Sequence, residues 1–328
     1  MNKAGLDDYV DVLKAAGEVT RARVLALLAH GELSVGELAQ ILRQSQPRLS
    51  RHMKYLSAAG LVERMPEGAW VFYRLATSGV GKAFIDNVLP MLNEADSEIE
   101  RDAERLTEVR SARRETASAY FARVAEDWDS LRALHYPEKE IEQAVLKIVG
   151  DGPFNVIYDM GTGTGRMLTL LSGVAEHVEG IDLSHQMLTV ARSNLDAAQV
   201  NNAVVRHGDA TSAPFEDGAA DVVIVHQVLH FLDEPARAIQ EAARVLKPGG
   251  RLIVVDFAPH DLEYLRRDQS HRFLGFEDET LSNWCVKSGL ELTQAQLFEA
   301  PSDIESGLAV KVWTAHAKIP AHKKEHVV

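Results

Sequence analysis

The chain has 328 residues, a formal net charge of −13 and a single cysteine, Cys285; this length suits about two domains, and one cysteine excludes an intrachain disulfide or a multi-cysteine metal site. No stretch approaches the roughly 18 apolar residues of a membrane-spanning helix, and the first residues lack the apolar core of a secretion signal, so we expect a cytoplasmic protein without a membrane partner. Residues 1–80 carry ten Lys/Arg and eight Asp/Glu, whereas residues 81–328 carry 25 and 40, which makes only the C-terminal part unsuited to nonspecific nucleic-acid binding.

Residues 1–80 show short helical patterns. The first pattern places four apolar side chains on one face, namely Tyr9, Val10, Leu13 and Ala16. Thr20 is a candidate cap for a second helix, which Gly31 ends. Ser34 caps a third helix, and Pro47 opens a fourth that ends at Gly60.

Two alternating stretches, 61–64 and 70–75, follow these helices and read as a hairpin with a turn at 65–68. Helices followed by a hairpin predict an α+β winged helix-turn-helix. Residues 43–54 contain four Lys/Arg and no acid, on the helix that reads DNA in such folds. The candidate DNA-binding residues, suited to phosphates and base edges, are Gln46, Arg48, Ser50, Arg51, His52 and Lys54.

Four segments resemble the ArsR-type winged-helix repressors, over roughly residues 5–80. They are Thr20–Leu25, Gly31–Leu38, Leu49–Leu56 and Ala59–Val62. Metal-sensing members of that family often carry thiols in the third-helix segment, where this chain has Ser34 and Gly36. Without thiolates, no soft-metal site is expected there.

Residues 81–117 are predicted to be a helical linker. Apolar side chains recur near heptad spacing at Leu92, Ala95, Ile99, Leu106 and Val109. This seam predicts a helix that pairs with a partner chain, but Asp102 interrupts it, and a solvated bridging helix is the alternative. The ArsR resemblance favours a homodimer, which would suit a palindromic double-stranded operator.

The C-terminal part alternates strand-like runs with helical patterns. The expected strands are 154–159, 176–182, 203–207, 220–226, 250–256, 290–298 and 308–316. The alternation predicts an α/β, doubly wound parallel sheet, and we expect the last strand to be antiparallel in an edge hairpin.

The first of these strands ends in an acid and a glycine-rich turn, with Asp159, Gly161, Gly163 and Gly165. Glycines let backbone approach a ligand closely, and Asp182, at the end of the second strand, would accept hydrogen bonds from ribose hydroxyls. Because Arg166 occupies the third glycine position of the dinucleotide fingerprint, an NAD-type site is disfavoured.

The D-x-G-x-G-x-G pattern and its successors resemble class I S-adenosylmethionine (AdoMet) methyltransferases, with a seven-stranded Rossmann-like sheet, across roughly residues 118–317. The resemblance implies AdoMet or S-adenosylhomocysteine (AdoHcy) as ligand. It places the methionine part over the glycine turn, Leu183 and Met187 beside adenine, Asp209 and Ala210 at the adenine edge, and His226 beside the sulfonium. Tyr120, Phe121, Trp128 and Asp129 resemble a lid helix.

If methyl transfer occurs, a base would help when the nucleophile arrives protonated. The catalytic candidates are His226, His230 and His260, with Asp256 and His271 as further candidates. His226 and His230 would lie one turn apart if that stretch were helical. A zinc site built from the three histidines is an alternative supported by residue type alone, and we predict no metal. The motif of base amino-methylation is absent, and one cysteine cannot supply arsenite methylation, so a small-molecule acceptor is left.

These features predict a transcriptional regulator that binds operator DNA and senses AdoMet or AdoHcy. Whether it also methylates a small molecule is left open. The alternative is an active methyltransferase whose winged helix serves only dimerisation or protein interaction. The predicted boundaries are 1–80, 81–117, 118–317 and a flexible tail, 318–328.

Overall fold

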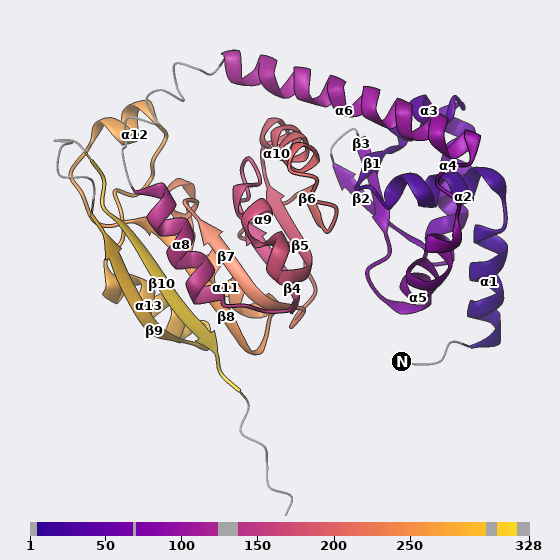
Figure 1. The fold of residues 1–328 in the computed structure, drawn as a ribbon. Helices are drawn as coiled ribbons and strands as arrows, with labels where there is room; N and C mark the ends of the chain where they lie inside the picture. The colour runs from indigo at the N-terminus through magenta and orange to yellow at the C-terminus, as the bar shows by residue number, and fades with distance from the viewer. Residues whose placement is uncertain (1–4, 68–69, 124–136, 300–306, 320–328) are drawn as a thin grey trace, which may run out of the picture.

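The computed structural model describes residues 5–67, 70–123, 137–299 and 307–319, without the side chains of 117–123 and Asp268. Two compact parts lie side by side, and the long helix α6 (Ser97–Arg123) extends from the first across the second (Figure 1). Among the described helices, none combines the length and apolar character needed to cross a membrane.

The N-terminal part packs helices against a small antiparallel sheet with strand order β1-β3-β2. Its elements are α1 (Leu6–Ala16), α2 (Val19–Leu28), β1 (Leu33–Ser34), α3 (Val35–Leu42), α4 (Gln46–Ala58), β2 (Val62–Glu67), β3 (Trp70–Leu75), α5 (Gly79–Val88) and the 3-10 turn η1 (Leu89–Met91). The predicted winged helix-turn-helix is confirmed, with α3 and α4 as the helix pair and β2–β3 as the wing.

The local sequence explains how the helix pair starts. The Ser34 hydroxyl accepts the Glu37 backbone N–H, and the Glu37 carboxylate accepts the Ser34 N–H at 2.7 Å, which forms a capping box. Pro47 occupies the first turn of α4, where its missing N–H removes no helical hydrogen bond. The buried face of α4 consists of Leu49, Met53 and Leu56. The basic side chains between them therefore face outward.

The apolar face that the sequence shows in α1 is not its buried face. Val12 and Ala15 are buried, whereas Tyr9 and Leu13 are 55% and 45% exposed. Both faces of this helix carry apolar residues at helical spacing, so periodicity alone does not tell which face meets the core. The exposed face is extended by Leu6, which is 78% exposed.

The predicted cap of α2 is also wrong. Glu18 caps the helix by accepting the Arg21 backbone N–H at 3.0 Å. Thr20 instead lies buried in the first turn, where its hydroxyl accepts a hydrogen bond from the Gln44 side chain. The wing is longer than expected, because β2 continues to Glu67 in register with β3, so its tip lies outside the described residues.

The linker helix does not use its apolar seam as expected. Leu106 and Val109 are buried in the core of the N-terminal part of the same chain. Asp102, which was expected to interrupt the seam, is 2% exposed and accepts two hydrogen bonds of 2.7 Å from the Arg23 guanidinium. α6 therefore packs on the winged helix, neither as a partner-chain coil nor as a solvated bridge. It also runs through the boundary predicted between residues 117 and 118.

The C-terminal part contains a seven-stranded sheet in the described residues, with order β6-β5-β4-β7-β8-β10-β9. The strands are β4 (Phe154–Met160), β5 (Ala175–Asp182), β6 (Ala203–His207), β7 (Ala220–His226), β8 (Leu246–Phe257), β9 (Leu290–Phe298) and β10 (Val310–Ala317). Only β10 runs antiparallel to its neighbours in the described pairings. The predicted class I methyltransferase topology is confirmed.

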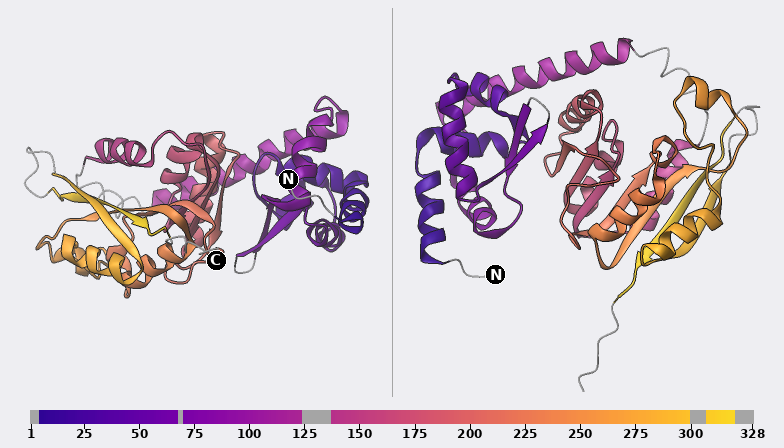
Figure 2. Two further views of the ribbon diagram at one scale, coloured as in Figure 1. Left: turned by 90° about the horizontal axis from the view of Figure 1, so that it is seen from below. Right: turned by 180° about the vertical axis from the view of Figure 1, so that it is seen from behind.

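Helices cover both faces of this sheet (Figures 1 and 2). The helical elements are α8 (Glu138–Val149), α9 (Arg166–Leu171), η2 (Ser172–Val174), α10 (His185–Ala197), η3 (Leu229–Phe231), α11 (Pro235–Val245), α12 (Tyr264–Asp268) and α13 (Asp278–Lys287). Side chains of α8, α9 and α10 pack in one core cluster, and those of α11 and α13 in the other. The centre of β7, residues 222–225, is apolar and fully buried, as expected for a parallel strand covered on both faces.

Candidate functional site

The turn after β4 brings bare backbone to the carboxyl edge of the sheet. Gly161, Gly163 and Gly165 have φ of 85°, 51° and 77°, which strains any residue with a Cβ. A Cβ on Gly161 would lie 2.2 Å from a methyl group of Val228, whereas a Cβ on Gly163 would meet no described heavy atom within 4 Å. The turn lies where strand order reverses between β4 and β7, the position at which doubly wound sheets bind ligands.

Asp159 is buried directly beneath this turn. It is 1% exposed, and its Oδ2 accepts the Thr162 hydroxyl at 2.6 Å. Its Oδ1 has no hydrogen-bond partner among the described residues. Burial raises the pKa of Asp159 to about 7, against the lowering effect of Thr162, and the Asp182 carboxylate adds to the rise.

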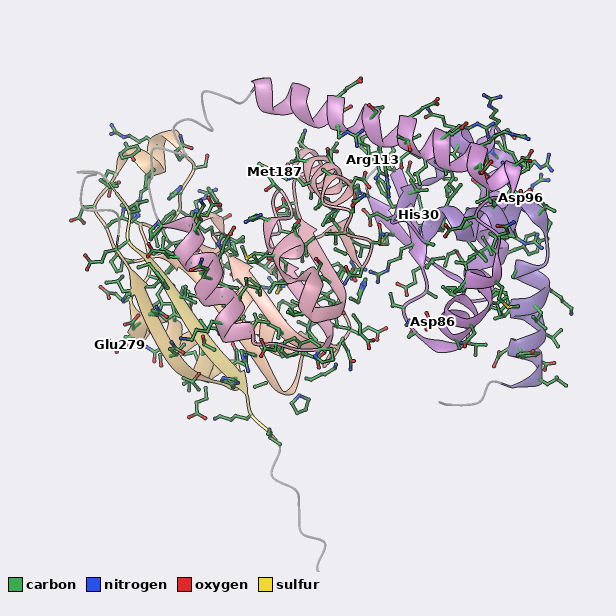
Figure 3. All side chains as sticks on the ribbon, in the orientation of Figure 1. His30, Asp86, Asp96, Arg113, Met187 and Glu279 are labelled. Carbon is green, nitrogen blue, oxygen red and sulfur yellow. The ribbon has the colours of Figure 1, made fainter. Side chains whose placement is uncertain are left out.

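Asp182 ends β5 beside the turn. Its Oδ2 accepts the Gly163 N–H at 2.9 Å, and its Oδ1 accepts the Ser184 N–H at 2.8 Å. These bonds fix the carboxylate and leave each oxygen a further lone pair for a ligand hydroxyl. Leu183 is 56% exposed next to it, and Met187 is half-buried on α10 (Figure 3).

Asp209 and Ala210 follow β6. Oδ1 of Asp209 accepts the Thr211 N–H and hydroxyl, at 2.7 and 2.8 Å, whereas Oδ2 makes no hydrogen bond among the described residues. Ala210 is buried. The predicted cofactor residues therefore gather at one sheet edge, and bare backbone, a fixed carboxylate and an unpaired acceptor fit a nucleoside that carries a positively charged group.

The candidate catalytic residues lie at the carboxyl ends of β7 and β8. We call His226, His230, Asp256, His260 and His271 the histidine cluster. Nδ1 of His230 lies 2.8 Å from Oδ1 of Asp256, and these residues are 2% and 0% exposed. The rings of His230 and His271 lie 4.3 Å apart between centroids.

His226 and His230 do not share a helical turn. His226 is the last residue of β7, and His230 lies in the 3-10 turn η3. Between them, Gln227 has φ of 55°, a strained value for a residue with a side chain, and its Nε2 has no partner among the described residues. The sequence did not indicate that Gln227 would be strained, because no local pattern marks a positive φ in a residue with a side chain.

Three imidazoles of this cluster, those of His226, His260 and His271, are poor bases in the folded chain. Burial lowers the pKa of His226 to about 4, and burial together with repulsion from His230 lowers that of His271 to about 4. The same two causes lower the pKa of His260. At neutral pH each of these three rings is therefore uncharged, with one N–H donor and one acceptor nitrogen.

The candidate DNA-binding side chains lie on the outer face of α4. Gln46, Arg48, Ser50, Arg51 and Lys54 are exposed. The sixth, His52, is different: its side chain is 14% exposed and lies 3.4 Å from Glu18, so it turns toward α2. The exposed set keeps three cations free for phosphate contacts.

Buried ion pairs join the two parts of the molecule at α10. Arg192, in the middle of this helix, bonds the carboxylates of Glu32 and Glu67, the latter at 2.5 and 3.1 Å. All three residues are at most 6% exposed. The guanidinium also lies 3.7 Å from the ring centroid of Phe72 in the wing. Arg192 therefore contacts the winged-helix domain at two places, next to β1 through Glu32 and at the end of β2 through Glu67.

A second buried pair joins β3 to β5. Arg74 bonds Glu179 at 2.7 Å, and Arg206 of β6 binds the other oxygen of Glu179 at 2.7 Å. Burial would raise the pKa of Glu179, but the charges of Arg74 and Arg206 and a bond from His177 lower it to about 2. Glu179 precedes Asp182 by three residues on the same strand.

Helix α6 adds further charged contacts between the two parts of the molecule. The Arg113 guanidinium bonds the Glu37 carboxylate at 2.7 and 2.8 Å and lies 3.4 Å from Asp196, near the end of α10 (Figure 3). Arg110 also pairs with Asp196, at 3.0 Å. A helix of the linker therefore contacts both domains through charged groups.

Two histidines near the glycine turn and Asp182 were not predicted from the sequence. His185, the first residue of α10, stacks on His207, the last of β6, with ring centroids 4.5 Å apart. Nδ1 of His185 lies 3.3 Å from Glu67, and the ring meets the edge of Trp70 in the wing. Neither residue carries a motif, so only the docked domains reveal this contact.

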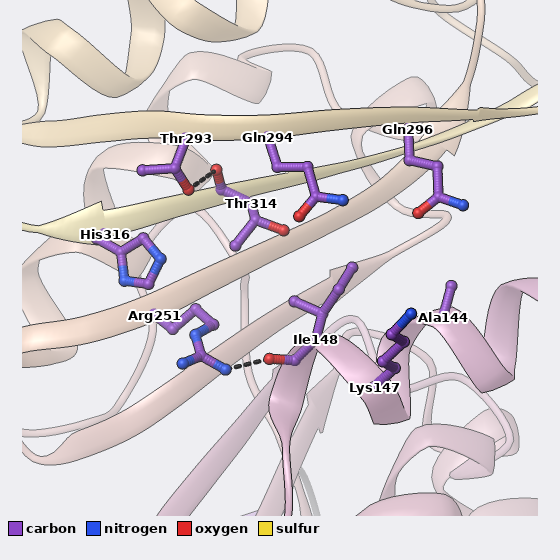
Figure 4. Close-up of a pocket in the computed structure, with 9 residues that line it drawn as sticks. All are labelled: Ala144, Lys147, Ile148, Arg251, Thr293, Gln294, Gln296, Thr314 and His316. Atoms are coloured by element: carbon purple, nitrogen blue, oxygen red, sulfur yellow. Dashed lines mark hydrogen bonds between the residues drawn. The ribbon is translucent and has the colours of Figure 1, made fainter.

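Within the described ranges no group of His, Cys, Asp and Glu is arranged to hold a metal ion. A pocket of about 300 Å³ lies between α8 and strands β8–β10, lined by Lys147, Arg251, Thr314 and neighbours (Figure 4). Because Arg251 pairs with Val222, near the amino end of β7, this pocket lies away from the carboxyl edge of the sheet.

Two family comparisons match this chain. Residues 18–64 match the bacterial regulatory proteins of the arsR family, and residues 158–254 match the methyltransferase domain. The first range contains α2 to α4, and the second runs from β4 into β8. Both resemblances seen in the sequence are confirmed.

Individual relatives match parts of the chain. A demethylmenaquinone methyltransferase from Clavibacter sepedonicus is 34% identical over 125 residues, 38% of this chain and 49% of the relative. The uncharacterized methyltransferase YcgJ from Bacillus subtilis is 27% identical over 184 residues, 52% of this chain and 69% of the relative. The crystal structure of YcgJ has a TM-score of 0.48 and 20% identity, covering 54% of this chain and 97% of that chain. The chain spans about half the length of the first relative.

Proposed function

Because the chain joins an arsR-family helix-turn-helix to a class I AdoMet methyltransferase domain, we propose that it is a transcriptional regulator that senses AdoMet or AdoHcy. The nucleoside would bind at the carboxyl edge of β4–β6, and operator DNA at α4. The observation that carries this proposal is the set of buried contacts by which α10 ties the nucleoside edge to the wing.

α10 supplies a continuous path between the two sites. Its first residue, His185, adjoins the nucleoside edge and contacts Glu67 of the wing. Arg192, two turns later, holds Glu67 and Glu32, and Asp196 pairs with α6. A ligand that shifts the start of this helix would therefore displace the wing. Such coupling requires that the ligand prefer one of two wing positions.

The DNA-binding face favours a regulator over a mere interaction module. Arg48, Arg51 and Lys54 are exposed and form no ion pair among the described residues. Residues that served only protein contact would not need three unpaired cations on the helix that enters the major groove.

A homodimer on a palindromic operator fits the same domain. α1 and the adjacent α5–η1 segment expose apolar side chains, including Leu6 at 78% and Met91 at 80%. The linker seam cannot serve this purpose in the described arrangement, because Leu106 and Val109 are buried within the chain. We therefore place the proposed dimer contact on α1 and α5.

The DNA function is tested with duplexes that the full-length protein selects from a random pool. Fluorescence anisotropy should show that Arg48→Ala and Arg51→Ala each weaken binding about tenfold and reduce the salt dependence by about one released counterion. Arg237→Ala, an exposed arginine of α11, is the control and should change nothing. Unchanged binding by both α4 variants would favour the alternative, a methyltransferase whose winged helix only mediates contacts.

A further inference from the structure

Apart from His226, which the methyltransferase resemblance places beside the sulfonium, the histidine cluster plays no part in the proposed sensing. From its geometry we propose that it is a methyl-acceptor site. His230 would take the proton from a neutral or cationic small molecule that reacts through a hydroxyl, amine or thiol. This inference rests on the proposed binding of AdoMet in the adjacent crevice.

The first support is the orientation of His230. Its Nδ1 donates to Oδ1 of Asp256 at 2.8 Å, and Oδ1 also accepts the Phe257 backbone N–H at 2.8 Å. The His230 carbonyl accepts the Arg272 backbone N–H at 2.7 Å, which anchors the turn. With the hydrogen on Nδ1, Nε2 is left with a lone pair, as a proton acceptor requires.

The second support is a set of polar atoms that lack partners. Among the described residues, Oδ2 of Asp256, Nε2 of His260 and both ring nitrogens of His271 are buried without a hydrogen bond. Nδ1 of His260 accepts the Leu262 N–H at 3.3 Å, so its Nε2 carries the hydrogen and is a donor. Buried polar groups are normally paired. Unpaired donors and acceptors in one cluster fit a ligand that is itself both donor and acceptor.

The charges around the cluster set the class of acceptor. The charged groups that act on its imidazoles are the carboxylates of Asp256, Glu142 and Asp261. None of the described Lys or Arg side chains bonds to the cluster. Glu142 is paired with the Arg166 guanidinium, whereas no described Lys or Arg bonds to Asp256 or Asp261. A carboxylate or phosphate at the reacting end would be repelled by these two carboxylates, whereas a hydroxyl, thiol or ammonium group would not be.

The reaction balances with these groups alone. Bound AdoMet supplies a methyl group on a positively charged sulfur, and the carbon–sulfur bond breaks toward sulfur as the acceptor's lone pair bonds to the carbon. The proton of the acceptor passes to Nε2 of His230 and later to water. In the proton transfer Asp256 is a positioning residue, because its Oδ1 keeps the hydrogen on Nδ1 of His230.

The test uses the full-length protein, methyl-labelled AdoMet and a small-molecule cell extract separated on an anion exchanger. We expect label to enter compounds of the unretained, neutral and cationic fraction. His230→Asn should lower the initial rate about 100-fold or more. His260→Gln, a half-buried member that can be changed with less risk to folding, should lower it less. The control His316→Asn, on β10 by the remote pocket, should leave it unchanged.

Three measurements separate positioning from structural damage. Calorimetry should give the same AdoHcy affinity for all variants. If the wild type did not bind AdoHcy, that result would count against the proposed sensing function. In Asp256→Asn the midpoint of the pH–rate profile should shift. A third measurement does not require turnover. 15N-histidine spectra of the wild type should show an exchange-protected Nδ1–H on His230, and this signal should disappear in Asp256→Asn. Label in the retained fraction only, no label at all, or an undiminished rate in His230→Asn would overturn the acceptor site.

Discussion

The two ends of the ligand-binding edge have different neighbours. At the β5–β6 end, Asp182 and His185 lie within a few residues of Glu179 and Arg192, which bond to the wing. At the β7–β8 end, the histidine cluster makes no hydrogen bond to the winged helix in the described residues. The adenosine half of a ligand would therefore affect the DNA-binding domain, and the reacting half would not. Sensing and chemistry can thus be separated by substitution.

The largest expected effect comes from breaking the docked end. Arg192→Met would leave Glu32 and Glu67 buried without their cation, and removing one partner of a buried pair costs about 3–5 kcal/mol. Urea unfolding should show this loss. The matched substitution Arg237→Met, at an exposed pair on α11, should stay within about 0.5 kcal/mol of the wild type. A loss no larger than the control's would mean that the domains are not docked as described.

The free energy of unfolding should depend on pH through Asp159, which lies beneath the glycine turn. The pKa of Asp159 is raised to about 7 in the fold, so the unfolded chain loses this proton first. The protonated Asp159 contributes its full share to the free energy of unfolding below pH about 4, and this contribution disappears as the pH rises to about 7. The difference is about 4 kcal/mol. Asp159→Asn, which cannot ionise, should therefore gain stability over the wild type as pH rises from 4 to 8.

Urea unfolding at a series of pH values checks this result, with the exposed Asp151→Asn as control. An advantage of Asp159→Asn that is the same at pH 4 and pH 8 would show that Asp159 is not held protonated. The stability contributed by the histidine cluster should depend on pH in the opposite direction. Burial lowers the pKa of His226 and His271, so their contribution falls when the medium becomes acid.

The affinity for AdoHcy should depend on the β5–β6 end of the ligand-binding edge and not on the histidine cluster at the β7–β8 end. Asp182→Ala removes two charge-assisted hydrogen bonds to ribose, together worth about 3 kcal/mol, so affinity for AdoHcy should fall about 100-fold. His230→Asn should bind AdoHcy as the wild type does. Calorimetry with AdoMet, AdoHcy and NAD measures both. A wild type that prefers NAD, or an Asp182→Ala variant with full affinity, would contradict the assigned nucleoside site.

Much of this architecture could be predicted because its signals are local. The glycine turn, the acids at strand ends and the basic helix each occupy a short segment with a known geometry. The junction could not be predicted in this way. Arg192 lies 160 residues from Glu32 and 125 from Glu67, and nothing in a single sequence pairs one charged residue with another at such separations.

The errors in α1 and η3 have related physical causes. α1 carries apolar residues on two faces, and only tertiary packing decides that Val12 and not Leu13 is buried. At His226 the strand continues to the sheet edge, and the strained Gln227 then redirects the chain, so a helical spacing does not imply a helix. The histidine cluster was found from residue types at strand ends, but its hydrogen bonds were not.

The central claim is that nucleoside binding reaches the wing through Glu67. The direct test is a thermodynamic cycle in which AdoHcy affinity is measured with and without the selected operator, and operator affinity with and without AdoHcy. In the wild type we predict equal reciprocal changes of about 5- to 150-fold, and in Glu67→Gln/His185→Ala a much smaller change with both separate affinities retained. Operator affinity that is independent of AdoHcy in the wild type, or full coupling in the double variant, would contradict the account.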